Sequence, residues 1–176
     1  ISGPFGMGGV GKTALALVIA DRLKDRYPDA QFHLDLRGVS DNPATREEAL
    51  AHVIRGFHPE AKLPESVAEL QPIYRSLLNG KQAILLMDNA RDAPQVEPLI
   101  PPKGCVMLVT SRNHFHLPGI YSKDLDKLPP KDAKDLLLTI CKRIGGSAER
   151  IAESCGCLPL ALRVAASTLN EYATLT

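Results

Sequence analysis

The stretch Gly6-Met7-Gly8-Gly9-Val10-Gly11-Lys12-Thr13 matches the pattern G-x-x-x-x-G-K-[ST] at every fixed position. A glycine-rich turn lets successive backbone N–H groups converge on a phosphate, because no Cβ blocks the approach. The run 14–20 that follows favours a helix, whose N-terminus attracts anions. A loop that merely turns would not need this helix. The stretch therefore predicts a phosphate-binding loop in which Lys12 reaches the outer phosphates and Thr13 ligates Mg²⁺.

Such a loop needs a second acidic group to hold the water shell of Mg²⁺ opposite the phosphates. Asp88 closes the apolar run 83–87, which lacks alternation and therefore fits a strand covered on both faces. We expect Asp88 to serve the metal together with Thr13. The alternative is an ordinary strand-end aspartate that caps the next turn.

Strand-like and helix-like segments alternate along the first two thirds of the chain. Four segments have the character of strands, namely 31–36, 83–88, 105–110 and 121–125. One of them, 31–36, comes between the phosphate loop and Asp88. We therefore expect an α/β fold: a P-loop NTPase parallel sheet of the type with an additional strand, sandwiched by helices.

The helices of this part have recognisable start and stop signals. The first is expected over 13–26, and capping boxes at Thr45/Glu48 and Ser66/Glu69 open two more. The third should end at Asn79-Gly80, a pair suited to a left-handed C-cap. Pro72 lies inside it and should shift its start or kink it.

After Leu128 no strand signal remains. Apolar residues at helical spacing predict helices over 131–143, 148–155 and 159–172. We therefore expect two domains, a P-loop nucleotide-binding domain at 1–128 and a helical subdomain at 129–176.

Composition narrows the class of protein. The 176 residues carry 21 basic and 20 acidic side chains, which gives a net charge of +1 and no nucleic-acid or membrane surface. No apolar run reaches the length of a membrane-spanning helix. The four cysteines lack a partner set for zinc and predict reduced thiols in a cytoplasmic protein. The chain reads as a piece of a longer one.

Two further polar positions follow strands and leave alternatives open. Arg112 comes after the strand 105–110, where it could contact a γ-phosphate or instead pair with an acid such as Asp92. Asp35 and Arg37 close the strand 31–36, as phosphate-edge or switch residues or as a strand-end ion pair.

Four stretches together resemble one family. They are Gly6–Thr13, Leu85–Asp92, Leu108–Arg112 and Gly156–Leu162. In order and spacing they resemble the NB-ARC domain, the nucleotide switch of STAND signalling ATPases. This class includes plant immune receptors, apoptosome proteins and bacterial transcriptional regulators. The sequence around Asp88 and over 34–38 is most similar to that of the bacterial regulator branch, whose members often add DNA-binding and tetratricopeptide repeat domains.

The resemblance implies a role for each matching residue. ADP or ATP with Mg²⁺ would be the cofactor, and Lys12, Asp88 and Arg112 the catalytic or sensing side chains. Thr13 and Asp88 would hold the metal, while Pro159 would pack on the adenine. The residues expected at the nucleotide are Met7, Gly8, Gly9, Val10, Gly11, Lys12, Thr13, Ala14, Pro159 and Leu160. Residues 129–176 would be an incomplete first ARC subdomain.

Two departures from the family pattern bear on function. Many relatives carry a second acid directly after the Asp88 equivalent, but this chain has Asn89, which cannot accept a proton at neutral pH. The winged-helix domain, whose Met-His-Asp motif locks ADP in the family, lies outside the chain. Some of the usual adenine-contacting residues before the loop are also missing.

These features favour a molecular switch with slow or no ATP hydrolysis, in which exchange of ADP for ATP drives a rearrangement. Its partners would be the nucleotide, further winged-helix, repeat or effector domains of the same chain, and other copies in a nucleotide-dependent homo-oligomer. The alternative is a P-loop ATPase or small-molecule kinase with real turnover. A kinase would need a base beside a phosphoacceptor, and His114 and His116 are more typical of a surface loop. A degenerate scaffold is disfavoured because Lys12, Thr13 and Asp88 are intact.

Overall fold

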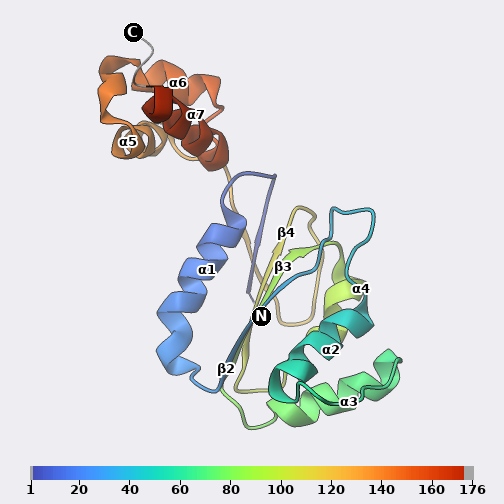
Figure 1. Cartoon of the computed structure of the whole chain (residues 1–176). Helices are drawn as coiled ribbons and strands as arrows, with labels where there is room; N and C mark the ends of the chain where they lie inside the picture. The colour runs from blue at the N-terminus through green and yellow to red at the C-terminus, as the bar shows by residue number, and fades with distance from the viewer. Residues whose placement is uncertain (1, 173–176) are drawn as a thin grey trace. The chain divides into compact units, whose positions relative to one another are not determined.

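The computed structural model describes residues 2–172. The chain forms two compact units, which are described separately. The first holds the residues up to 6 and 12–124, and the second holds 7–11 and the residues from 125 onward. Figure 1 shows the elements of both units along the chain. The boundary expected between 128 and 129 stays a prediction.

The first unit is built on a five-stranded parallel sheet. In spatial order its strands are β2 (Ala30–Asp35), β3 (Ala83–Ala90), β4 (Val106–Ser111), β1 (Ser2–Phe5) and β5 (Tyr121–Asp124). Strand β4 lies between β1, which leads into the glycine-rich loop, and β3, which carries Asp88. This order confirms the α/β P-loop sheet with an additional strand.

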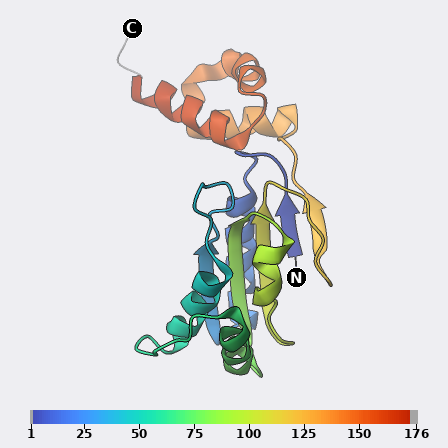
Figure 2. The ribbon, with the colours of Figure 1, turned by 90° about the vertical axis from the view of Figure 1, so that its right-hand side faces the viewer.

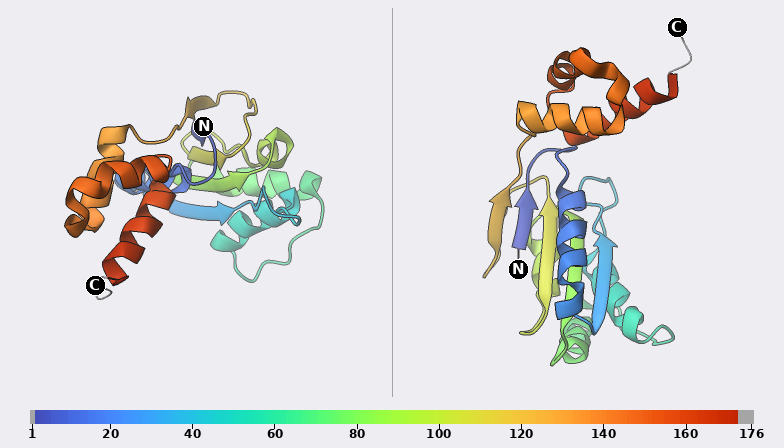
Figure 3. Two further views of the ribbon diagram at one scale, coloured as in Figure 1. Left: turned by 90° about the horizontal axis from the view of Figure 1, so that it is seen from above. Right: turned by 90° about the vertical axis from the view of Figure 1, so that its left-hand side faces the viewer.

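Helices cover both faces of this sheet. Helix α1 (Lys12–Leu23) packs on one face, where Ala16 meets Leu86 and Leu108. Helices α2 (Arg46–Phe57) and α3 (Val67–Leu78) pack on the other, on a larger core that includes Met87 and Val109. In Figure 2, α2 and α3 lie in front of the sheet, and in the right-hand view of Figure 3, α1 lies in front of it. Alternate residues of each strand therefore point to opposite helical layers.

Capping residues place the starts of the two helices on that larger core. Thr45 Oγ1 accepts a hydrogen bond from the Glu48 N–H, and Glu48 accepts one from the Thr45 N–H, so the expected capping box is present. At α3 only half of the expected box forms, since the Glu69 carboxylate accepts from the Ser66 hydroxyl instead of its backbone N–H. Helix α3 begins at Val67 and continues through Pro72, so its start is not shifted, and the alternative effect of Pro72, a kink, stays a prediction.

Short elements complete the first unit. They are the 3₁₀ helices η1 (Lys24–Arg26) and η2 (Glu97–Leu99) and the single-turn helix α4 (Ala93–Val96). Strand β3 extends two residues beyond the expected end at Asp88, with a register shift against β4 between Met87 and Ala90. Asn89 has a φ of +56°, a left-handed conformation inside this irregularity.

The second unit contains helices α5 (Pro130–Ile140), α6 (Ala148–Ser154) and α7 (Pro159–Glu171), with 3₁₀ helix η3 (Lys142–Ser147) after α5. Its buried core is small and rich in alanine, comprising Ala133, Leu137, Cys141, Ala152, Cys157, Leu162 and Ala166. The four cysteines of the chain are free thiols. Within residues 2–172 no helix is long and apolar enough to cross a membrane.

Candidate nucleotide-binding site

The lysine of the glycine-rich motif lies at the first turn of α1. This residue, Lys12, is only 9% exposed, and its Nζ donates a hydrogen bond to the Gly6 carbonyl at 2.7 Å. Burial lowers the pKa of Lys12, the nearby positive charge of Arg112 lowers it further, and Asp88 partly opposes both effects. The charges of Arg112 and Asp88 therefore both act on the Lys12 ammonium.

Helix α1 and strand β3 meet through the two residues that the sequence assigns to magnesium. Thr13 Oγ1 lies 2.8 Å from Asp88 Oδ1 and 3.1 Å from Oδ2. Asp88 is 9% exposed, so its carboxylate lies at the bottom of the site. A hydroxyl and a carboxylate oxygen are the hard donors that Mg²⁺ prefers, and Mg²⁺ completes its shell with water and phosphate oxygens. The donor set fits a magnesium–nucleotide complex.

Thr110 of strand β4 supports Asp88 from the other side, a contact that sequence reasoning missed. Its buried hydroxyl donates a short hydrogen bond to Asp88 Oδ1 and accepts one from the Asn89 N–H at 2.9 Å. The sequence offered one signal for this contact: Thr110 is a polar residue near the end of an apolar strand. Thr110 fixes the orientation of the Asp88 carboxylate, because one oxygen of it is held by two hydroxyl groups.

The backbone around Arg112 is anchored on both sides. Ser111 Oγ donates to the Ala90 carbonyl at 2.6 Å, and Asn113 Nδ2 donates to the Arg91 carbonyl at 3.1 Å. The Arg112 side chain is exposed. Among residues 2–172 no ion pair joins Asp92 to Arg112, and the Asp92 carboxylate instead accepts from the Gln95 N–H at the start of α4.

The expected pair at the end of β2 is only partly as predicted. The Arg37 guanidinium pairs with Glu48 at 2.6 Å rather than with Asp35. Asp35 Oδ1 instead accepts from the Arg37 backbone N–H at 2.8 Å and from Asn89 Nδ2 at 3.3 Å. The tight path of this segment requires Gly38, where a Cβ would clash with the backbone of Asn89.

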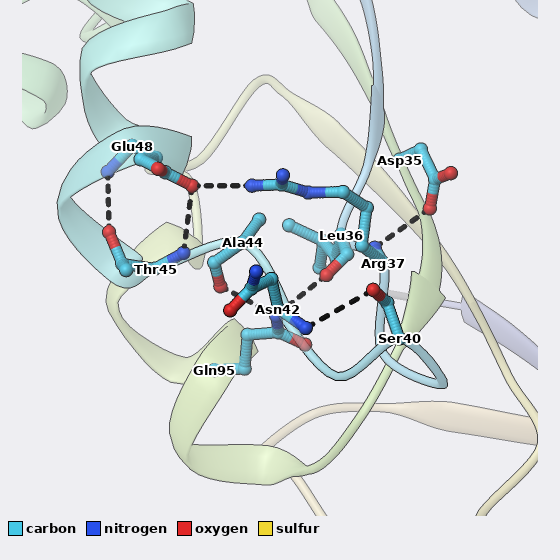
Figure 4. Close-up of polar contacts among 9 residues, drawn as sticks. All are labelled: Asp35, Leu36, Arg37, Ser40, Asn42, Ala44, Thr45, Glu48 and Gln95. Atoms are coloured by element: carbon cyan, nitrogen blue, oxygen red, sulfur yellow. Dashed lines mark hydrogen bonds and ion pairs between the residues drawn. The ribbon is translucent and has the colours of Figure 1, made fainter.

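Gln95 of α4 closes the loop between β2 and α2, as Figure 4 shows. It is 7% exposed, and its Nε2 donates to the carbonyls of Leu36 and Ala44 at 2.9 and 2.8 Å. Its Oε1 accepts from the Arg91 N–H at 2.8 Å. A pocket of about 330 Å³ lies beside the loop, lined in part by Asp35, Arg37 and Glu48. Nothing in the local sequence singled out Gln95, because the two carbonyls that it binds, those of Leu36 and Ala44, lie more than fifty residues away.

Within the second unit, residues 7–11 of the glycine-rich loop lie against the first turn of α7. The Leu160 N–H donates to the Gly9 carbonyl at 3.2 Å, and Pro159 occupies the first turn, where a missing N–H costs nothing. Gly9 and Gly11 have φ values of +82° and +97°, which only glycine adopts readily. Met7 and Leu160 are each 59% exposed, whereas Val10 is buried. Two parts of the expected site, the loop and the Pro159-Leu160 pair, are therefore neighbours in this unit.

Two regulatory proteins are similar to the whole chain. Regulatory protein AfsR of Streptomyces coelicolor is 40% identical over 184 residues, and AfsR of Streptomyces griseus is 38% identical over the same length. A probable disease resistance protein of Arabidopsis thaliana is 28% identical over 97% of the chain. The chain spans only 18%, 19% and 21% of these three relatives, respectively.

Solved structures share the fold. The chain matches RuvB of Thermotoga maritima (P216G mutant) with a TM-score of 0.62 over 99% of its length and 56% of that chain. It matches a STAND protein with a tetratricopeptide repeat sensor, PH0952 of Pyrococcus horikoshii, with a TM-score of 0.55 over 93% of its length and 26% of that chain. Both are 18% identical in sequence.

No family model matches the chain. The likeness is instead to individual proteins, since regulators from two Streptomyces species align with every part of the chain and plant disease resistance proteins align more distantly. The P-loop sheet and the structural likeness to a STAND protein agree with those alignments. The expected resemblance to the NB-ARC domain of STAND signalling ATPases, closest in kind to the bacterial regulator branch, is therefore confirmed.

Proposed function

We propose that this chain is the nucleotide-binding switch of a longer regulatory protein, and that it binds ADP or ATP with Mg²⁺. The observation that carries the proposal is the contact of Thr13 with Asp88 beside the buried Lys12. Asp88 comes from a part of the chain distant from Lys12 and Thr13, and a structural role alone gives no reason to bury an ammonium next to a carboxylate at a helix N-terminus.

Each candidate residue has a proposed role. The backbone from Gly8 to Thr13 and Lys12 Nζ would hold the β-phosphate, which requires the ammonium to leave the Gly6 carbonyl. Thr13 and Asp88 would orient Mg²⁺ and its water shell. Arg112, held in place by its anchored neighbours, would contact a γ-phosphate. Pro159 and Leu160 would contact the base.

The switch would work through the difference between the two nucleotides. Only ATP offers a γ-phosphate to Arg112, so ATP would favour a conformation in which that contact is made. A ligand shifts a conformational equilibrium only by its differential affinity for the two states, and about 5.5 kcal/mol is needed to move it from 1:99 to 99:1. We propose that residues 129–176 form the first ARC subdomain and take part in this change. Further domains and self-assembly would convert it into an output.

The test is nucleotide binding by calorimetry in Mg²⁺ and in EDTA. Lys12→Ala should weaken ADP and ATP binding at least about a hundredfold, because a charge-assisted contact worth about 3 kcal/mol is lost. Lys24→Ala, which removes an exposed ammonium just after α1, is the matched control and should bind as the wild type does. Equal affinity of the Lys12→Ala variant and the wild type would contradict the site.

A further inference from the structure

Asp35 lies beside Asp88 on the same face of the sheet. The two are register partners on the adjacent parallel strands β2 and β3, whose axes are about 4.8 Å apart. Paired residues of parallel strands point to the same face, and for this pair it is the face covered by α1, where Thr13 contacts Asp88. A second carboxylate is therefore one strand away from the expected magnesium site.

The Asp35 carboxylate is oriented by two donors on one of its oxygens. Oδ1 accepts from the Arg37 N–H at 2.8 Å and from Asn89 Nδ2 at 3.3 Å. Among residues 2–172, Oδ2 has no hydrogen-bond partner, and the side chain is exposed. Oδ2 is thus open to water, while the bonds to Oδ1 limit rotation of the group.

The amide at residue 89 is compatible with a carboxylate at Asp35 on β2. In its left-handed conformation Asn89 turns its amide toward Asp35 and donates to it. A carboxylate at residue 89 would have no proton to donate and would repel both Asp35 and Asp88. The amide and the acid at these two positions are therefore complementary, and one acid besides Asp88 remains at this edge of the sheet.

We propose that Asp35 is the carboxylate that orients and deprotonates the attacking water in slow ATP hydrolysis, in the position that an acid at residue 89 would otherwise serve. This rests on the proposed function. The water oxygen forms a bond to Pγ, and the bond from Pγ to the bridging oxygen breaks with its electron pair going to ADP. The water proton passes to Asp35 Oδ2 and then to solvent, so the products are ADP and phosphate.

The experiment is single-turnover hydrolysis of ATP by the purified protein in excess over nucleotide, with ADP affinity measured in parallel. General-base catalysis contributes about 10²–10⁴ in rate, so Asp35→Asn should slow hydrolysis at least tenfold. Its ADP affinity should stay within about twofold, because the amide oxygen still accepts from Arg37. Asp41→Asn makes the same chemical change at an exposed position in the following loop and should leave the rate unchanged.

An unchanged rate in Asp35→Asn would overturn the proposal and leave Asp35 as a residue that only closes the turn at Arg37. A wild-type protein that binds ADP but hydrolyses no ATP would overturn it as well, while the proposed function would stand. If the wild type binds neither nucleotide, both proposals fail. A slowed rate with unchanged ADP affinity supports the water-activating role, because loss of folding would weaken binding too.

Discussion

At the scale of single residues, the candidate site depends on hydroxyl groups as much as on charges. Asp88 is held by Thr13 from α1 and by Thr110 from β4, so its carboxylate cannot turn without breaking a hydrogen bond. Thr110 also accepts from the Asn89 N–H, which fixes the start of the irregular end of β3. Thr110 therefore sets the orientation of the Asp88 carboxylate without itself being an expected ligand contact.

Thr110 is expected to act through magnesium. Thr110→Val keeps the shape but removes both hydrogen bonds, and outer-shell substitutions typically cost about 10–100-fold in metal affinity. Nucleotide affinity in Mg²⁺ should therefore fall about tenfold, while affinity in EDTA should change little. Titration calorimetry under both conditions checks this. Thr110→Ser, which retains the hydroxyl, should rescue the loss, and equal losses in Mg²⁺ and EDTA would argue for a general structural defect.

At the scale of elements, the loop between β2 and α2 is held in place by side chains from neighbouring helices. Gln95 of α4 binds the carbonyls at both ends of the loop, and Glu48 of α2 combines a helix cap with an ion pair to Arg37. The ion pair is half-exposed, and such pairs contribute about 0–1 kcal/mol. The buried amide of Gln95 is therefore the stronger restraint on the loop.

Removal of the Gln95 side chain should destabilise the first unit. Gln95→Ala removes three hydrogen bonds and leaves the Ala44 carbonyl and the Arg91 N–H without this partner, while the Leu36 carbonyl keeps the Ala44 N–H, so the free energy of unfolding should fall by about 2–4 kcal/mol. Urea unfolding followed by circular dichroism measures the change. Gln82→Ala, at an exposed position, should stay within about 0.5 kcal/mol of the wild type. A similar small effect for both variants would refute the role of Gln95.

At the scale of the whole molecule, the sheet unit owes much of its stability to the layer formed by α2 and α3. Tyr74 of α3 is fully buried there, and its hydroxyl donates to the Leu99 carbonyl at 2.5 Å. Burial raises the pKa of Tyr74 far above its ordinary value of about 10. The phenol therefore remains protonated in the folded protein under conditions where the unfolded chain would lose its proton.

Alkaline unfolding should report this residue. Because the folded pKa is raised, the contribution of Tyr74 is fully present below about pH 10 and is lost as the pH rises above it, by up to about 1.4 kcal/mol per pH unit. Tyr74→Phe should cost about 1 kcal/mol at pH 8, and the difference from the wild type should shrink and then reverse between pH 10 and 12. Denaturant titrations across this range measure it. A constant difference would show that Tyr74 does not ionise on unfolding.

Much of this fold could be predicted from local patterns. The motif Gly6–Thr13, the unalternating apolar run before Asp88 and the capping box at Thr45 each depend on neighbours a few residues away, and each forms as expected. The misses have the opposite origin. The extension of β3 beyond Asp88 and the unshifted start of α3 despite Pro72 depend on packing against other elements, which overrides local preference.

The sequence by itself determined the glycine-rich loop, the order of strands and helices along the chain and the resemblance to a family, because contiguous residues encode these features. Only the tertiary structure decided which side chains meet. It joined Asp35 to Asn89, Thr110 to Asp88, and Gln95 to the loop of β2. Those partners are separated by more than twenty residues and come together only when parallel strands align their carboxyl ends, which no local pattern records.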